Sequence, residues 1–203
     1  LSNKELSEIS NRLGKSRIIE VQKIFGGCIN HSWRIDFTDS RIFIKKNERN
    51  EKLLKFEQYC LNDIRKFNNA QSTIIPEVID YFEYEHNEFL LLEWLDLKNS
   101  NQKKLGLGIA EIHLNSNKIN PNKFGYPIPG FIGTTKQLAG WENNWADCFI
   151  KLRIEPQIAL LKDFPINIDL IDSIKSKIKI HLSDHDPMIS LIHGDLWSGN
   201  ISS

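Results

Sequence analysis

The uninterrupted apolar run at residues 89–92, Phe-Leu-Leu-Leu, constrains the fold of this chain more than any other segment. An extended strand points successive side chains to opposite faces, so a strand with this sequence needs apolar cover on both faces. Two earlier segments, Ser32–Phe37 and Arg41–Lys46, alternate apolar and polar residues and predict shorter strands. The sequence therefore predicts a small antiparallel sheet whose central strand lies within Glu88–Leu95.

Helical and strand patterns divide the chain near residue 95. Before that point we also predict helices at Ser2–Leu13 and Glu51–Phe67 and strands at Ile18–Phe25 and Ile74–Tyr81. After a polar linker at Lys98–Gln102 we predict helices at Leu105–Leu114, Trp141–Ile154 and Ile168–Leu182. We also predict a long loop at Asn117–Thr135 and a short strand at Ile189–Ile192. We therefore expect an α+β protein with a sheet-containing lobe at 1–95, a mostly helical lobe at 96–203, and a ligand cleft between them.

Composition and charge exclude several classes of function. The chain of 203 residues has 26 Lys plus Arg and 26 Asp plus Glu, so it lacks the basic surplus expected of a duplex nucleic-acid binder. No apolar run approaches the roughly 20 residues that span a bilayer, and from the polar first residues we expect no signal peptide. The cysteines, Cys28, Cys60 and Cys148, form no CxxC pair, which is typical of a reducing compartment. We expect a cytoplasmic protein with no nucleic-acid or membrane partner.

Glu57 is the first residue whose position needs a chemical explanation. Placed at 100° per residue, the apolar side chains of Glu51–Phe67 form one broad arc, and Glu57 falls near its middle. A carboxylate buried there without a partner is costly, so the pattern predicts either a cation facing Glu57 or a polar cleft around it. Lys45 is the predicted partner, although strand alternation alone does not decide between Lys45 and Lys46.

The glycine pair Gly26-Gly27 lies in the turn between the first two predicted strands. Glycine has no side chain to block an anion, so backbone N–H groups of such a turn can bind phosphate. Taken alone, such a pair is more often an ordinary hairpin turn. The adjacent Cys28 would be redox-sensitive if these N–H groups point at its sulfur, and otherwise is a small residue that fits the turn.

The segment His193-Gly194-Asp195, with Asn200 five residues after the aspartate, has the spacing of a phosphoryl-transfer loop. An aspartate fixed in a loop after a buried strand can accept a proton from a substrate hydroxyl. An asparagine five residues later can place its carbonyl oxygen on a magnesium ion. Such a site works by positioning and charge neutralisation, which is the chemistry of phosphoryl transfer.

Together these residues resemble the fructosamine (ketosamine) kinases, a branch of the aminoglycoside phosphotransferase and protein-kinase-like superfamily. The resemblance covers nearly the whole chain, and its most specific motif is Ile192–Asn200. The other motifs are Gly26–Asn30, Phe43–Asn47, the helix with Glu57, Phe89–Leu95, Leu105–His113, Phe124-Gly125 and a block from Gly130 to Gln157. The resemblance implies a protein-kinase-like two-lobed fold and transfer of the γ-phosphoryl group of ATP, with Mg²⁺, to a sugar hydroxyl of a ketosamine.

The resemblance implies roles for residues around the nucleotide. The glycine-containing turn would cover the ATP phosphates, and Lys45 would touch the α and β phosphates and pair with Glu57. The segment after the central strand would be a hinge that receives adenine through backbone hydrogen bonds. The residues of this turn and hinge are Gly26, Gly27, Cys28, Ile29, Asn30, Glu93, Trp94 and Leu95.

Three residues near the end of the chain would act on the acceptor and the metal. Asp195 would be the base that accepts the proton of the sugar hydroxyl, and Asn200 would be a magnesium ligand. Trp197, next to the base, would shape the sugar site.

The sequence departs from this family at its end. The family continues beyond Asn200 with a second metal-binding aspartate and further helices, and the sequence stops at Ser203, so we expect a C-terminally truncated chain. Two alternatives remain at this point. One is a catalytically inactive kinase-like protein that binds a nucleotide or a protein partner, and the other is a kinase for another small aminated or hydroxylated substrate.

Overall fold

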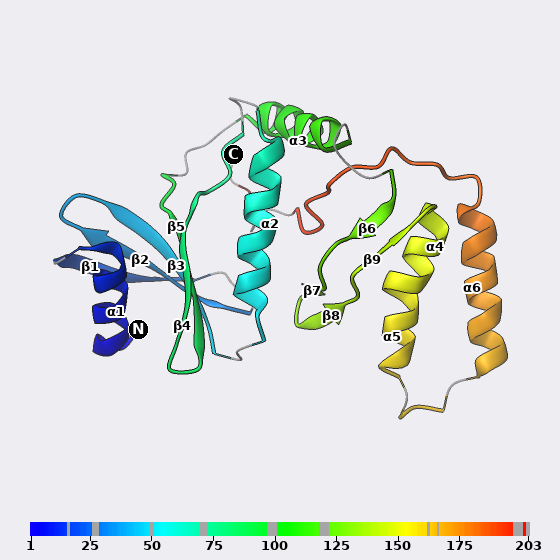
Figure 1. The fold of residues 1–203 in the computed structure, drawn as a ribbon, viewed down its shortest axis with the longest axis horizontal. Coiled ribbons are helices and arrows are strands. Elements are labelled where there is room, and N and C mark those ends of the chain that lie inside the picture. The colour runs from blue at the N-terminus through cyan, green and yellow to red at the C-terminus, as the bar shows by residue number, and fades with distance from the viewer. Residues whose placement is uncertain are drawn as a thin grey trace. The chain divides into compact units, whose positions relative to one another are not determined.

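The computed structural model describes most of the chain, as two compact units (Figure 1). The described residues are 1–15, 17–25, 29–48, 51–69, 73–96, 101–117, 122–161, 163–165, 167–196 and 201. By its internal contacts the first unit consists of Leu1–Ile112 with His193–Ser203, and the second of His113–Ile192. The boundary after residue 95 that the sequence predicts between two lobes stays a prediction.

The first unit is built on a five-stranded antiparallel sheet with the strand order β1-β2-β3-β5-β4. Its strands are β1 (Ile18–Ile24), β2 (His31–Phe37), β3 (Arg41–Asn47), β4 (Val78–Tyr84) and β5 (Asn87–Glu93). The β4 strand begins four residues later than predicted, because Pro76 has no N–H for the ladder and restricts the residue before it. The predicted antiparallel sheet is confirmed.

Helices α1 (Asn3–Leu13) and α2 (Leu53–Phe67) lie on opposite faces of this sheet (Figure 1). On the α1 face, Phe89 and Leu91 of β5 belong to a core that includes Ile9. On the α2 face, Leu90 and Leu92 pack with Leu54 and neighbouring apolar side chains. The apolar run therefore has cover on both of its faces, as the sequence predicts.

Helix α1 begins and ends where its sequence dictates. Ser2 and Glu5 form a capping box, in which the Ser2 hydroxyl accepts from the Glu5 N–H and the Glu5 carboxyl accepts from the Ser2 N–H. At the other end Gly14 has a φ of 63° and its N–H donates to Asn11. A residue without Cβ adopts this left-handed conformation at little cost, and so ends the helix.

The described part of the second unit contains short strands and several helical segments. Its elements are β6 (Phe124–Tyr126), β7 (Gly130–Ile132), β8 (Thr135–Gln137), β9 (Gly140–Glu142), α4 (Trp145–Phe149), the π-helix η1 (Ile150–Ile154), α5 (Glu155–Ala159) and α6 (Ile168–Leu182). Strands β6 and β9 pair, as do β7 and β8. A core of Phe124, Cys148 and Leu152 holds β6 against α4 and η1. Along the chain, α3 (Gln102–Asn117) follows β5 and precedes β6, and its residues divide between the two units.

The prediction of one helix over Trp141–Ile154 is wrong at its start and incomplete at its end. Trp141 belongs to β9, and the helix begins after Asn144, whose side chain accepts from the Asp147 N–H at 2.8 Å. Further along, Pro156 has no N–H to donate to the Leu152 carbonyl, which accepts from Arg153 Nη1 at 2.8 Å. The helical ladder shifts to a π-helix just before this proline.

Two other predictions about the later part of the chain are corrected. The predicted loop Asn117–Thr135 contains the strands β6 and β7. The segment Ile189–Ile192, predicted as a strand, forms no strand pairing. Its backbone bonds instead to side chains of α3: the Leu191 N–H donates to Ser116 Oγ at 2.8 Å, and the Ile189 carbonyl accepts from Asn117 Nδ2 at 2.7 Å. These bonds satisfy backbone groups that would pair with a neighbouring strand if this segment lay in a sheet.

Gly125 provides a stability test of the second unit. It has a φ of 138°, and a Cβ built on it would lie 1.9 Å from the Gly140 carbonyl oxygen of the paired strand. We expect Gly125→Ala to lower the free energy of unfolding by about 3 kcal/mol or more, because backbone strain and overpacking add. Gly133→Ala is the matched control, since Gly133 also has a positive φ, of 61°, but a Cβ added there would meet nothing within 4 Å. Equal losses for the two variants in chemical denaturation would contradict the close approach at Gly125.

Among the described residues, no helix combines the length and the apolar character needed to cross a bilayer.

Candidate functional site

The ion pair between Lys45 and Glu57 is the centre of the candidate site. Lys45 Nζ on β3 lies 2.5 Å from Glu57 Oε1 on α2. Both side chains keep more than a quarter of their surface exposed, at 28% and 29%. The cation that the position of Glu57 calls for is therefore Lys45, and the pair presents an ammonium that is held in place yet reachable by an anion.

The neighbouring lysine points to the other face of the sheet. Lys46 Nζ lies 3.0 Å from Glu5 of α1 and 3.0 Å from Glu48. Contact with these two acids raises the pKa of Lys46 against an opposing effect of burial, which is the largest single influence. Lys45 and Lys46 thus pair with acidic side chains on opposite faces of the sheet. Strand alternation alone does not indicate which of the two lysines pairs with Glu57, and the structure shows that it is Lys45.

Asn47 connects the end of β3 to the last residue of the predicted phosphate-binding turn. Its Nδ2 group donates to Asn30 Oδ1 at 2.7 Å, and its side chain is almost completely buried. Asn47 lies on the same face of β3 as Lys45, two residues further along. Of the predicted turn, Ile29 and Asn30 are described, whereas Gly26, Gly27 and Cys28 lie outside the described residues.

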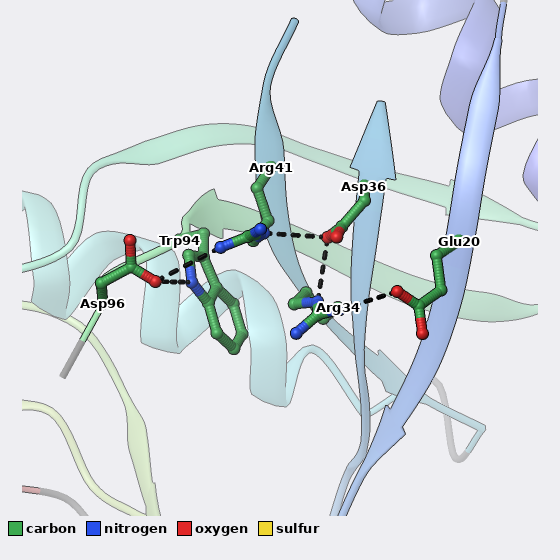
Figure 2. A network of polar contacts seen from close by, with 6 residues as sticks. All are labelled: Glu20, Arg34, Asp36, Arg41, Trp94 and Asp96. Carbon is green, nitrogen blue, oxygen red and sulfur yellow. Dashed lines mark hydrogen bonds and ion pairs between the residues drawn. The ribbon is translucent and has the colours of Figure 1, made fainter. Parts of the chain in front are cut away.

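The predicted hinge is tied to the sheet by a network of charged side chains (Figure 2). Asp96 accepts from the Trp94 indole Nε1 at 2.8 Å and pairs with Arg41 at 3.3 Å. Arg41 also pairs with Asp36, which pairs in turn with Arg34. Figure 2 shows these side chains extending from the strands to the Trp94 ring, over which both arginines lie within 6 Å of its centre.

Glu93, the first residue of the predicted hinge, forms hydrogen bonds to the neighbouring chain segment of the sheet. The Glu93 N–H donates to the Glu77 carbonyl at 2.9 Å, and Glu93 Oε2 accepts from the Glu77 N–H at 3.2 Å. This pair extends the contact between β4 and β5 by one residue. Binding of adenine by Glu93, Trp94 and Leu95 stays a prediction, and the Glu93 N–H is not the group that would donate.

The segment with Asp195 belongs to the same compact unit as Lys45 and Glu57. The Asp195 N–H donates to His193 Nδ1 at 3.3 Å, which requires that nitrogen of the ring to be unprotonated. Gly194 between them has a φ of 81°, a conformation that few residues other than glycine adopt. Backbone and ring together form a tight turn that exposes Asp195.

The charges around His193 connect this turn to the ion pair. Protein atoms crowd the His193 ring and lower its pKa below the usual 6.5, although part of the residue still reaches solvent. The negative charges of Asp195 and Glu57 both oppose this shift. Because the folded state favours the neutral ring, the stability that depends on it is lost as the pH falls below 6.5. The charge of Glu57 thus acts on the pKa of His193 in the same direction as the charge of Asp195.

The remaining predicted residues concern the sugar and the metal. Trp197 and Asn200 lie outside the described residues. Within the described part of the chain, no group of three or more His, Cys, Asp or Glu side chains could hold a metal ion. A magnesium ion bound with ATP takes most of its ligands from phosphates and water and needs only one or two protein oxygens.

Sequence reasoning assigned no role to two buried polar residues on the α2 face. They are Asn47 and Glu88, which lie opposite each other on β3 and β5 and are 1% and 0% exposed. A signal for both exists in the sequence, since Asn47 follows the two lysines and Glu88 immediately precedes the apolar run. Polar residues at such positions are buried with hydrogen-bond partners, and those partners identify their roles.

The chain that contains this site matches a known protein family. Residues 2–203 match the family model described as fructosamine kinase. A Vibrio cholerae protein named "Probable ketoamine kinase" is 30% identical over 203 residues, and the match covers 98% of this chain and 69% of that protein.

Solved structures show the same fold. A Haemophilus somnus protein named "Putative fructosamine-3-kinase" superposes with a TM-score of 0.78 at 28% identity, over 97% of this chain and 66% of that one. A thermostable mutant of aminoglycoside phosphotransferase APH(4)-Ia, in a ternary complex with AMP-PNP and hygromycin B, superposes with a TM-score of 0.58 at 14% identity, over 97% of this chain and 66% of that one. The chain therefore spans about two thirds of the length of these proteins, and the predicted α+β, protein-kinase-like fold is confirmed.

Proposed function

The chain belongs to the fructosamine kinase family, and on that premise we propose that it acts in an ATP-dependent phosphotransferase that phosphorylates a sugar hydroxyl of a ketosamine. The observation that carries the proposal is the ion pair of Lys45 with Glu57 on the α2 face of the sheet. An ammonium held 2.5 Å from a carboxylate yet partly exposed is suited to bind phosphate oxygens of a nucleotide.

The nucleotide would be bound by three segments of the first unit. Lys45 would contact the α and β phosphates while Glu57 keeps its ammonium in position. The turn from Gly26 to Asn30 would cover the phosphates, and the buried bond from Asn47 holds the end of that turn. The hinge, Glu93–Leu95, would receive adenine. The APH(4)-Ia structure with AMP-PNP, which shares this fold, supports a nucleotide site in the present chain.

Asp195 would act on the acceptor. A sugar hydroxyl of the ketosamine attacks the γ-phosphorus of ATP, the bond from that phosphorus to the β–γ bridging oxygen breaks, and the hydroxyl proton passes to the Asp195 carboxylate. ADP and the phosphorylated ketosamine leave. The short turn formed by His193 and Gly194 would hold the backbone of Asp195 in place for this step.

A magnesium ion bound with ATP would supply positive charge that offsets the negative charge developing on the phosphates. Asn200 is the proposed protein ligand. Its carbonyl oxygen is a hard donor of the kind that Mg²⁺ prefers.

A coupled assay of ADP release tests the proposal. The full-length protein is incubated with Mg-ATP and a fructosyl-amine, and the product is analysed by ³¹P NMR. We expect ADP release that depends on the fructosyl-amine and a phosphate ester on the sugar.

The control and the alternatives are contained in the same assay. The unglycated amine should give no release of ADP above the background. Turnover with another aminated or hydroxylated compound but not with fructosyl-amines would contradict the ketosamine as acceptor and identify a different one. No turnover at all, together with no thermal stabilisation by Mg-ATP, would contradict both the kinase and the nucleotide-binding proposals.

A further inference from the structure

Helix α2, which carries Glu57, begins without a cap of its own. The N-cap residue Lys52 has a φ of 63°, and its side chain forms no capping hydrogen bond. The N–H of Leu54, the second residue of the helix, donates instead to Glu88 Oε2 of β5 at 3.1 Å. A capping side chain normally accepts from this position, so Glu88 supplies from the sheet the cap that the helix lacks.

Glu88 is itself held in place on both of its oxygens. The residue is completely buried, and its Oε1 accepts from the Tyr81 hydroxyl at 3.1 Å. Burial and the neighbouring Glu88 charge raise the pKa of Tyr81 far above its ordinary value, so the hydroxyl remains a donor throughout the accessible pH range. The same hydroxyl lies 3.1 Å from Glu83, which pairs with Lys52 at the start of the helix. These contacts join the first turn of α2 to β4 and β5.

The strand register places this cap close to Lys45. Lys45 lies opposite Leu90 of β5, and Glu88 is two residues from Leu90 on the same face. On α2, Glu57 follows Leu54 by three residues, one helical turn later. Glu88 therefore fixes the start of the helix against the strand that neighbours Lys45, and Glu57 projects from the next turn.

We propose that Glu88 is a positioning residue that holds Glu57 opposite Lys45 by capping α2 from within the sheet. The inference deepens the proposed function, because it identifies what keeps the phosphate-binding ammonium in place. Glu88 touches neither lysine nor nucleotide in this account and acts only through the helix.

Chemical labelling of lysines tests this without relying on activity. The full-length protein is treated with a limiting amount of acetic anhydride, and acetylation of Lys45 and Lys46 is quantified separately by mass spectrometry. Glu57→Gln removes the partner of Lys45 and sets the reference. We expect Glu88→Gln, which keeps the shape but loses one acceptor oxygen, to raise labelling of Lys45 about threefold, as the reference does, and to leave Lys46 unchanged.

Glu5→Gln is the matched control. Glu5 is also a buried glutamate that holds a helix to this sheet, but on the opposite face and against Lys46. It should raise labelling of Lys46 and leave Lys45 at the wild-type level. In the double variant Glu57→Gln with Glu88→Gln, labelling of Lys45 should not exceed that of Glu57→Gln alone, because Glu88 acts only through Glu57.

Each outcome decides the proposal. If Glu88→Gln folds and labels Lys45 as the wild type does, or if the two variants add, the proposal is wrong. If Glu88→Gln does not fold, Tyr81→Phe replaces it, because it removes the hydroxyl that contacts both Glu88 and Glu83. A rise in labelling confined to Lys45 supports the proposal, and wild-type labelling rejects it. Failure of the kinase assay with wild-type protein would reject the proposed function and leave this labelling result standing.

Discussion

Replacing Asp195 by asparagine in the full-length protein should lower kcat with a fructosyl-amine by about 10²–10⁴-fold, the range of a lost general base. The amide keeps the size of the side chain and the N–H bond to His193, but it cannot accept the proton of the sugar hydroxyl. Binding of Mg-ATP should change little, because Asp195 is proposed to act on the acceptor. Steady-state kinetics and calorimetric titration with Mg-ATP measure the two effects separately.

Asp186→Asn serves as the control for this substitution. Asp186 is an exposed aspartate nine positions earlier in the chain, and its replacement should leave kcat unchanged. Equal activity of Asp195→Asn and the wild type would contradict the role of Asp195, as would a loss that comes entirely from weaker binding of Mg-ATP.

Replacing Lys45 by methionine should lower kcat/KM for Mg-ATP by about 10²–10³-fold, the usual effect of removing one group that stabilises charge in the transition state. Methionine retains the length of the side chain and loses the ammonium. Glu57, left without its cation, should also raise the apparent Kd of Mg-ATP, because a carboxylate would then face the phosphates.

Lys46→Met is the matched control for Lys45→Met. The two lysines are adjacent in β3, yet Lys46 pairs with Glu5 on the opposite face of the sheet. Its loss should lower the stability of the fold by leaving the buried Glu5 without its cation, and should leave kcat/KM nearly unchanged in the protein that remains folded. Similar losses of activity in both variants would place the nucleotide elsewhere.

The sequence predicts the sheet well because the signals for it are local. The apolar run at residues 89–92 specifies a strand covered on both faces, and helices α1 and α2 supply that cover. The position of Glu57 in an apolar arc similarly predicts a cation opposite it. What these patterns do not contain is the identity of that cation, because alternation separates Lys45 from Lys46 without indicating which face α2 occupies.

Other features depend on contacts between distant residues. Ile189–Ile192 has the composition of a strand, but its backbone bonds to Ser116 and Asn117, more than 70 positions earlier. The cap of α2 comes from Glu88, 34 positions after Leu54, and a lysine at the N-cap position is the one local sign that the helix needs an outside acceptor.

An NMR titration of His193 tests the central claim, that the ion pair and the Asp195 turn form one site. In the wild type its pKa should lie below 6.5, and the charges of Glu57 and Asp195 should keep it from falling further. Both Glu57→Gln and Asp195→Asn should therefore lower it. If Asp195→Asn lowers the pKa of His193 and Glu57→Gln does not, the pair and the turn are separate and the account is wrong.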